Sequence, residues 1–223
     1  MEKFRKRNRE LIASNWRSCL PAMRVYKSMR LAKVNGPLLV GLCLTENSGH
    51  DSYSIEPHVH NLAHPYGFIS LTIADPLKNK RNTYHDSFTL KSHEREFPDA
   101  CKRLHSQTIF PLGENLSLSQ ILWAYDAFVE KRFSFVTKSI YIDPVCYLTW
   151  CGKIDDAKRM AETNVKAMSQ WEDRNFVYDG GKQKVLDYLL GVPEHPEKLR
   201  ETRDEQIKLL KLDGLPDYGL TCD

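Results

Sequence analysis

Three runs of apolar residues, each of strand length, dominate the first half of the chain. They occupy residues 36–47, 52–62 and 66–76, with Asn, Ser, Gly and Pro between them. Asn35-Gly36 is the dipeptide typical of a type I′ hairpin turn, so we predict a partner strand within residues 23–34. A short run at 84–90 is a candidate last strand. The pattern predicts an antiparallel β-meander of about four to five strands.

The run at 66–76 has the clearest alternation of apolar positions. Ile69, Leu71 and Ile73 fall on one face, as in a strand with one buried side. A proline stands at each end, and proline lacks the amide donor that a central strand position needs. We therefore predict a strand over residues 66–74 with these three side chains in the core.

Helical spacing of apolar residues flanks the predicted sheet. Residues 2–20 form an amphipathic pattern that stops before Pro21, which predicts an amino-terminal helix. From residue 91 the pattern is again helical, and we expect an interruption near Pro98.

The second half of the chain reads as helices throughout. Residues 110–115 are a linker, after which Ser117 and Gln120 form a capping box at the start of a helix. Residues 139–171 predict a helical hairpin with Asp143 as the N-cap of its first helix and Gly152 at its C-terminal end. Its YLTWCGKIDDAKRMAE segment resembles one unit of a tetratricopeptide-type hairpin, in a single copy. Two further helices are predicted at 182–190 and 197–212.

These elements predict an α+β fold. An N-terminal helix and the antiparallel meander occupy residues 1–112, and a helical C-terminal half packed on them occupies 113–223. The short FPLGEN connection favours one compact unit over two independent domains.

Composition narrows the function only slightly. Of the 223 residues, 32 are Lys or Arg and 29 are Asp or Glu, a balance too even to indicate nucleic-acid binding by itself. No apolar run is long enough for a membrane span, and the basic N-terminus leads into no secretion signal. The six cysteines include no CxxC pair, so we predict free thiols in a cytoplasmic protein.

His58 and His60 are the strongest candidate metal ligands. Two residues apart on a strand, they share a face and can bind one ion, with His64, Asp75 or His85 as a third ligand. The alternative is that these histidines are hydrogen-bonded polar residues of the sheet. The metal interpretation predicts a metal-dependent hydrolase that uses His58, His60 and His64.

Other catalytic signals are missing from the sequence. It contains no nucleophile elbow, phosphate loop or dinucleotide fingerprint, and we predict no cofactor. Cys101 and His105 lie one helical turn apart, a coincidence expected in many chains of this size. The balance favours a binding protein over an enzyme.

Aromatic and basic residues supply the candidate binding surface. Tyr and Trp side chains with arginine are typical anchors of protein interfaces. We select Arg5, Arg7 and Arg9 on the first helix as candidates. The large rings considered are Tyr53, Tyr66, Tyr84, Trp123, Trp150, Trp171, Tyr178 and Tyr218, of which the first three are the selected candidates. A weak nucleic-acid site at the arginine cluster is a further alternative, and it predicts binding that falls steeply with salt.

The order of elements resembles a group of small bacterial proteins. A basic helix, a hairpin whose second arm is NGPLLVGLCL, the YSIEPHVHNL and YGFISLTIADPL strands and the CGKIDDAKRMAE hairpin are similar to uncharacterised α+β proteins of the polymorphic-toxin immunity type. The resemblance implies a cytoplasmic protein-binding module that neutralises a cognate toxin by occlusion. Immunity proteins against basic nuclease toxins are acidic, whereas this chain is slightly basic, so a neutral or acidic toxin domain is implied as partner.

Overall fold

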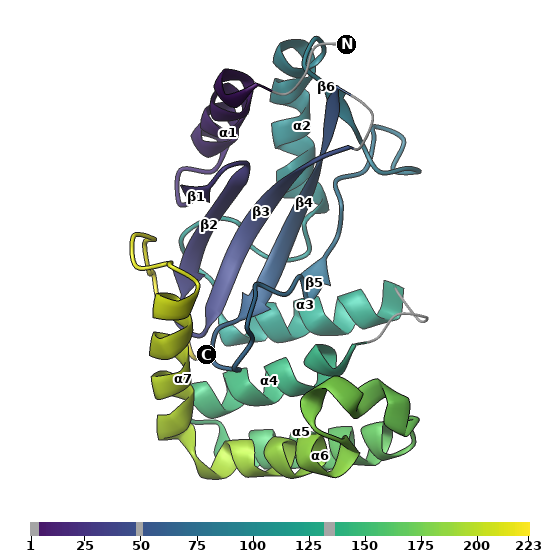
Figure 1. Ribbon diagram of the computed structural model, residues 1–223, viewed down its shortest axis with the longest axis vertical. Helices are drawn as coiled ribbons and strands as arrows, with labels where there is room; N and C mark the ends of the chain where they lie inside the picture. The colour runs from purple at the N-terminus through teal and green to yellow at the C-terminus, as the bar shows by residue number, and fades with distance from the viewer. Residues whose placement is uncertain (1–4, 48–50, 132–136) are drawn as a thin grey trace.

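The computed structural model describes residues 5–47, 51–131 and 137–223 (Figure 1). The strands are β1 (Arg24–Lys27), β2 (Arg30–Asn35), β3 (Leu38–Glu46), β4 (Ser52–Asn61), β5 (Ile73–Ala74) and β6 (Phe88–Thr89). The helices are α1 (Lys6–Cys19), α2 (His93–Gln107), α3 (Leu118–Lys131), α4 (Lys138–Trp150), α5 (Ile154–Ser169), α6 (Lys182–Gly191) and α7 (Pro196–Leu209), with 3₁₀ helices η1 (Asp173–Asp179) and η2 (Val192–Glu194). An N-terminal helix, an antiparallel sheet and a helical C-terminal half confirm the predicted α+β class.

The sheet is antiparallel throughout, in the order β1-β2-β3-β4-β5, with β6 also paired to β4. Asn35 pairs with Leu38 in the β2–β3 hairpin, so Gly36 and Pro37 form the turn. Gly36 has φ 59°, a conformation that glycine adopts without strain. The prediction that Asn35 belongs to the turn is therefore wrong by one residue: Asn35 ends the strand, and its amide holds the carbonyls of Glu114 and Gly219, at 2.9 Å each.

The predicted strand over residues 66–74 is mostly wrong. Only Ile73 and Ala74 pair with β4, and Leu71 is exposed instead of buried. The preceding residues cover one face of the sheet, where the Ser70 amide donates to His60 Nδ1 at 3.0 Å. Alternation alone did not distinguish a segment that lies on a sheet from one that extends it.

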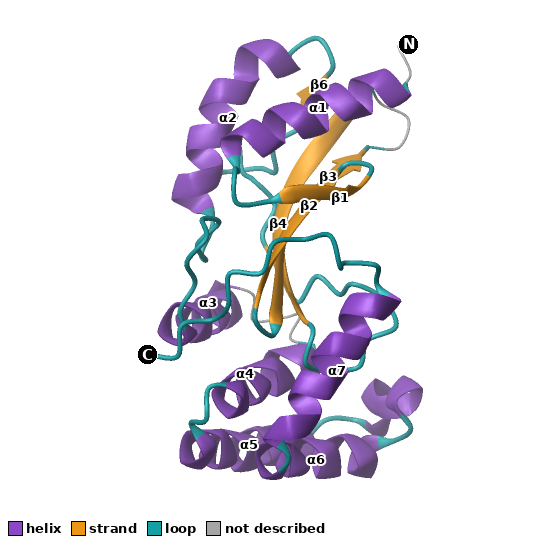
Figure 2. Ribbon diagram, turned by 90° about the vertical axis from the view of Figure 1, so that its left-hand side faces the viewer, coloured by secondary structure: helices purple, strands orange, loops and turns teal. Residues whose placement is uncertain are grey.

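The two faces of the sheet pack against different elements. Figure 2 shows α1, α2 and α3 on one side and α7 on the other. We call the first side the core face, and its strand residues join the main hydrophobic cluster. The opposite, outer face has a small cluster made of Ala32, Val34, Leu39, Leu62 and Leu212. His58 and His60 belong to the outer face because they pair with Gly41 and Leu39 across the β3–β4 ladder.

The helical half begins as predicted at α3. The Ser117 amide donates to Gln120 Oε1 at 3.0 Å, and the Gln120 amide donates to Ser117 Oγ at 3.3 Å, which confirms the capping box. The α4–α5 hairpin also forms, and Gly152 follows α4 with φ 72°. Helix α2 runs through Pro98 without the predicted break.

Asp143 is not the N-cap of α4. The helix starts at Lys138, five residues earlier, so Asp143 lies in its middle and is fully buried. The apolar residues on both sides of Asp143 allow the helix to begin earlier and to bury this face. Pro144 is consequently an interior residue of α4 instead of its first.

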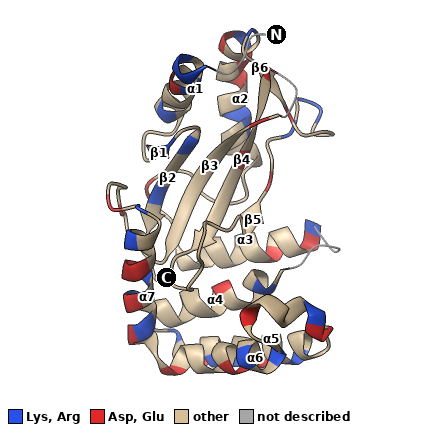
Figure 3. Cartoon of the chain, viewed as in Figure 1, with Lys and Arg blue, Asp and Glu red and all other residues tan. Residues whose placement is uncertain are grey.

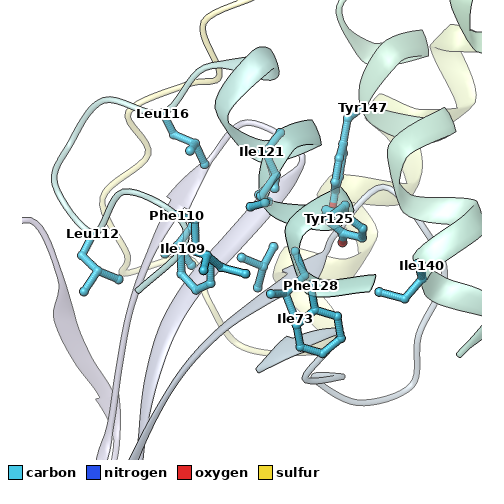
Figure 4. Close-up of a cluster of buried hydrophobic side chains, with 14 of the residues drawn as sticks. Ile73, Ile109, Phe110, Leu112, Leu116, Ile121, Tyr125, Phe128, Ile140 and Tyr147 are labelled. Carbon is cyan, nitrogen blue, oxygen red and sulfur yellow. The ribbon is translucent and has the colours of Figure 1, made fainter. Parts of the chain in front are cut away.

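One hydrophobic cluster extends across both halves of the chain. It contains sheet residues such as Ile73 together with side chains from α3, α4, α5 and α6. Figure 4 shows where the connection between α2 and α3 joins it: Ile109 and Phe110 lie near Ile121 and Phe128 of α3.

Four of the six cysteines are paired, so the prediction of free thiols is wrong for them. Cys19 is bonded to Cys101, which joins α1 to α2, and Cys151 is bonded to Cys222. Cys43 and Cys146 are free and buried. Sequence separations of 82 and 71 residues left no local spacing pattern to recognise. Among the described residues no helix is long and apolar enough to cross a membrane.

Candidate functional site: a groove beside helix α3

The three histidines predicted to bind a metal come from strand β4 and the segment that follows it. His58 and His60 share the outer face of the sheet, as predicted, but each ring has its own surroundings. In the described part of the chain, His58, His60 and His64 do not bring one ring nitrogen each to within 4.8 Å of the other two, as a shared metal ion would require. Asp75, a proposed third ligand, lies 4.0 Å from Lys131 Nζ instead.

Each of the three histidines has one hydrogen-bonded ring nitrogen, but the buried Nε2 atoms of His58 and His60 have no hydrogen-bond partner in the described structure. His60 Nδ1 accepts from the Ser70 amide and lies 2.8 Å from Ser70 Oγ, while His64 Nδ1 lies 2.8 Å from the Tyr188 hydroxyl. Burial disfavours the charged imidazolium and lowers the pKa of His58 to about 4, of His60 to about 3 and of His64 to about 4. These rings are neutral structural groups at neutral pH.

Asp143 forms the centre of a buried polar cluster. Its carboxylate accepts from Asn61 Nδ2 at 2.9 Å and from the Tyr125 hydroxyl at 2.7 Å, and the Tyr147 hydroxyl lies 3.2 Å from that of Tyr125. Burial raises the pKa of Asp143 to about 7. Asp143, Asn61, Tyr125 and Tyr147 are all fully or almost fully buried. The cluster ties the end of β4 to α3 and α4.

The three tyrosines selected as binding residues differ in their exposure. Tyr53 is fully buried in the core, where its hydroxyl accepts from Trp16 Nε1 at 3.0 Å and lies 2.7 Å from His93 Nδ1. Tyr66 is half-buried and its hydroxyl lies 2.6 Å from Ser139 Oγ. Tyr84 is exposed, in the charged turn before β6. Tyr53 is thus a core residue of β4, whereas Tyr66 is half-buried against α4.

The arginine cluster is partly neutralised. Arg9 makes a two-pronged contact with Glu46, in which Nε donates at 2.6 Å and Nη2 at 3.0 Å. Arg5 and Arg7 are exposed at the start of α1. Figure 3 shows Lys and Arg gathered on α1, whereas α5, α6 and α7 carry both signs. Arg5 and Arg7 have no ion-pair partner among the residues that the structure describes, and two arginines are few for a phosphate-binding surface.

A groove beside α3 exposes a large aromatic side chain. It has a volume of about 630 Å³ and lies between the α2–α3 connection and the first two turns of α3. The lining residues are His105, Thr108, Ile109, Phe110, Pro111, Leu112, Gly113, Ser119, Gln120 and Trp123. We call this site the α3 groove.

The local sequence explains how the α3 groove forms. Ile109, Phe110 and Leu112 turn their side chains into the core, as Figure 4 shows for the first two. The backbone of this stretch consequently lies along the groove. In the described structure, none of the backbone–backbone hydrogen bonds outside helices and strands involves residues 109–113. Of these five residues only Gly113 is exposed, and Pro111 has no amide hydrogen.

Trp123 forms one wall of the α3 groove and is 61% exposed. It is on the side of α3 opposite the buried stripe that includes Leu118, Ile121 and Tyr125. Helical periodicity could have predicted this outward position, since residue 123 falls between the apolar positions. The groove itself could not be predicted, because it depends on the path of the α2–α3 connection.

Residues 116–119, which follow the groove-lining connection, already pair with the extended segment 221–223. The Leu118 amide donates to the Thr221 carbonyl at 2.8 Å, and the Thr221 amide donates to the Leu116 carbonyl at 3.0 Å. Asp223 then accepts from the Ser119 amide at 2.9 Å, and its contacts with Ser119 lower the pKa of its carboxyl to about 2. This edge of the molecule thus binds extended backbone in the residues immediately beside the α3 groove.

Known proteins provide no guide to the chemistry of this site: no protein-family model, no curated protein and no solved structure matches the chain.

Proposed function

We propose that the chain is a protein-binding module that takes an extended segment of a partner protein into the α3 groove. The observation that carries this proposal is the combination of an exposed tryptophan in the groove with an adjoining segment, Leu116 to Leu118, that already pairs with extended backbone. Backbone pairing supplies affinity for an extended peptide, and a neighbouring pocket selects its side chains. Trp123 supplies the large rigid contact that interface hot spots use.

The lining of the groove indicates the chemistry of the partner segment. None of its residues is an aspartate, glutamate, lysine or arginine. The volume of about 630 Å³ is within the range of ordinary ligand pockets, which suits a few side chains of a peptide. We therefore infer a segment with apolar and uncharged polar side chains, whose binding depends little on salt.

An immunity protein is the specific form of this function that the sequence resemblance implies. In that form the partner is a toxin domain, and occlusion requires only that the bound surface overlap the toxin's own site. The extended-segment proposal supports protein binding in general and leaves the identity of the partner to experiment. The metal-dependent hydrolase has less support, since His58, His60 and His64 do not converge.

Selection from a displayed library of random linear peptides tests the proposal. We expect enriched peptides with apolar side chains, and a Trp123→Ala variant that binds them at least about 30-fold more weakly, the loss of about 2 kcal/mol typical of a hot spot. Tyr178→Ala is the matched control, because Tyr178 is fully exposed and does not line the groove. Failure to enrich any peptide, or equal binding to the wild type and Trp123→Ala, would contradict the proposal.

A further inference from the structure

A second candidate site lies at the contact between α1 and α2. Cys19 ends α1, while Cys101 and His105 are four residues apart on one side of α2. The ligand atoms of these three residues all lie within 4.8 Å of one another. They are the only residues in the described part of the chain that form such a group. The two cysteines are half-buried and His105 is exposed, so solvent reaches the site.

The position of His105 fits a tetrahedral metal ion. In a zinc site with Zn–S of about 2.3 Å and Zn–N of about 2.0 Å, tetrahedral angles place the nitrogen about 3.6 Å from each sulfur and the sulfurs about 3.8 Å apart. His105 Nε2 lies 3.8 Å from Cys19 Sγ, close to the required spacing. A ring nitrogen of His105 also lies within 4.8 Å of Cys101 Sγ, and the two sulfur atoms must separate for an ion to enter.

The other cysteine pair provides an internal comparison. Cys151 and Cys222 are also bonded, but no histidine or carboxylate completes a ligand group around them in the described structure. A purely structural cross-link needs no third ligand. The histidine beside Cys19 and Cys101 is thus the feature that distinguishes the two pairs.

We propose that Cys19, Cys101 and His105 form a redox-controlled zinc site. Two equivalents of a low-molecular-weight thiol reduce the disulfide, giving two cysteine thiols and one small-molecule disulfide. Zn²⁺ then displaces one proton from each thiol, and His105 binds through Nε2 in the tautomer with its proton on Nδ1. Water supplies the fourth ligand at this accessible position. A small-molecule disulfide reverses the sequence: it takes two electrons from the thiolates, reforms the Cys19–Cys101 bond and releases the ion.

Cobalt titration under anaerobic conditions tests this site, because thiolate-bound Co²⁺ has charge-transfer absorption that Zn²⁺ abolishes when it replaces the ion. We expect one Co²⁺ per reduced chain and none per oxidised chain. His105→Ala should weaken binding at least about tenfold, since even indirect partners of a ligand change affinity by that factor. His105 is exposed, so this variant should fold normally. Cys151→Ser is the matched control and should bind cobalt as the wild type does.

Three results would overturn the zinc site. The first is a reduced, folded chain that binds no Co²⁺. The second is an affinity that is the same in the wild type, Cys19→Ser and His105→Ala, since it would place the ion on the buried thiols of Cys43 and Cys146 or elsewhere. The third is a reduced chain that loses its circular-dichroism spectrum and does not regain it with Zn²⁺, since bound metal should replace the cross-link.

Discussion

Replacement of Asp143 by asparagine should make the protein more stable at neutral and alkaline pH. The side chain is completely buried, and burial raises the pKa of its carboxyl from the ordinary 3.8 to about 7. Each pKa unit corresponds to about 1.4 kcal/mol, so ionised Asp143 costs the folded state about 4 kcal/mol at pH 8. Asparagine has nearly the same shape and carries no charge at any pH.

The sign of the pH dependence follows from the raised pKa. Below about pH 4 the carboxyl is protonated in both the folded and the unfolded chain, and it costs nothing. Between pH 4 and pH 7 the Asp143 carboxyl ionises in the unfolded chain but stays mostly protonated in the folded chain. The free energy of unfolding therefore falls as pH rises through this range. The hydrogen bonds survive in Asp143→Asn, because the Tyr125 hydroxyl can accept from the new amide and donate to Tyr147, 3.2 Å away.

Urea unfolding followed by tryptophan fluorescence measures the effect. We expect the free energy of unfolding of Asp143→Asn to equal that of the wild type within about 1 kcal/mol at pH 4 and to exceed it by up to about 4 kcal/mol at pH 8. Asp213→Asn, at an exposed position, is the control and should show no such divergence. A difference that stays constant across this pH range, or a variant that is less stable than the wild type at pH 8, would refute the reasoning.

Two further predictions concern buried groups of the sheet. Lys33 is fully buried, and burial lowers its pKa to about 8, so its charge destabilises the folded chain below pH 8 and this cost disappears as pH rises toward 10.5. In urea unfolding at pH 7, Lys33→Met should raise the free energy of unfolding by up to about 3 kcal/mol, less the contribution of the lost hydrogen bond to Asn35. A variant that is equally or less stable would contradict this prediction. A methyl group at Gly41 would lie 2.5 Å from two atoms of the His58 ring, so Gly41→Ala should lower the free energy of unfolding by about 1–3 kcal/mol. In a double-mutant cycle, most of this loss should disappear in a His58→Ala background, and additive losses of stability would exclude the clash.

Local sequence signals predicted the elements that depend on local physics. The amphipathic pattern of α1, the capping box of α3 and the glycine after α4 are each determined by residues within one or two turns, and they form where expected. The meander also follows from successive apolar runs. Errors arose where distant packing decides: residues 66–72 cover the outer face instead of pairing, and Asp143 is buried in mid-helix because Asn61 and Tyr125 satisfy it.

The functional residues were harder to predict for the same reason. His58 and His60 do share a face, as their spacing indicates, but the partner of His60 is Ser70, in the segment wrongly predicted to be a strand. Cys101 and His105 were recognised as one helical turn apart, while Cys19, the third member, is 82 residues from Cys101. The α3 groove has no sequence signature, since it arises from inward-facing side chains of residues 109–112 and one outward tryptophan.

Affinity capture in the native host tests the central claim most directly. Tagged wild type, Trp123→Ala and Tyr178→Ala are expressed in parallel, and the proteins that co-purify with each are quantified by mass spectrometry. The protein-binding account predicts a stoichiometric partner that is retained by the wild type and Tyr178→Ala and lost from Trp123→Ala. A partner held equally by all three chains, or none held by the wild type, would contradict the assignment of partner binding to the α3 groove.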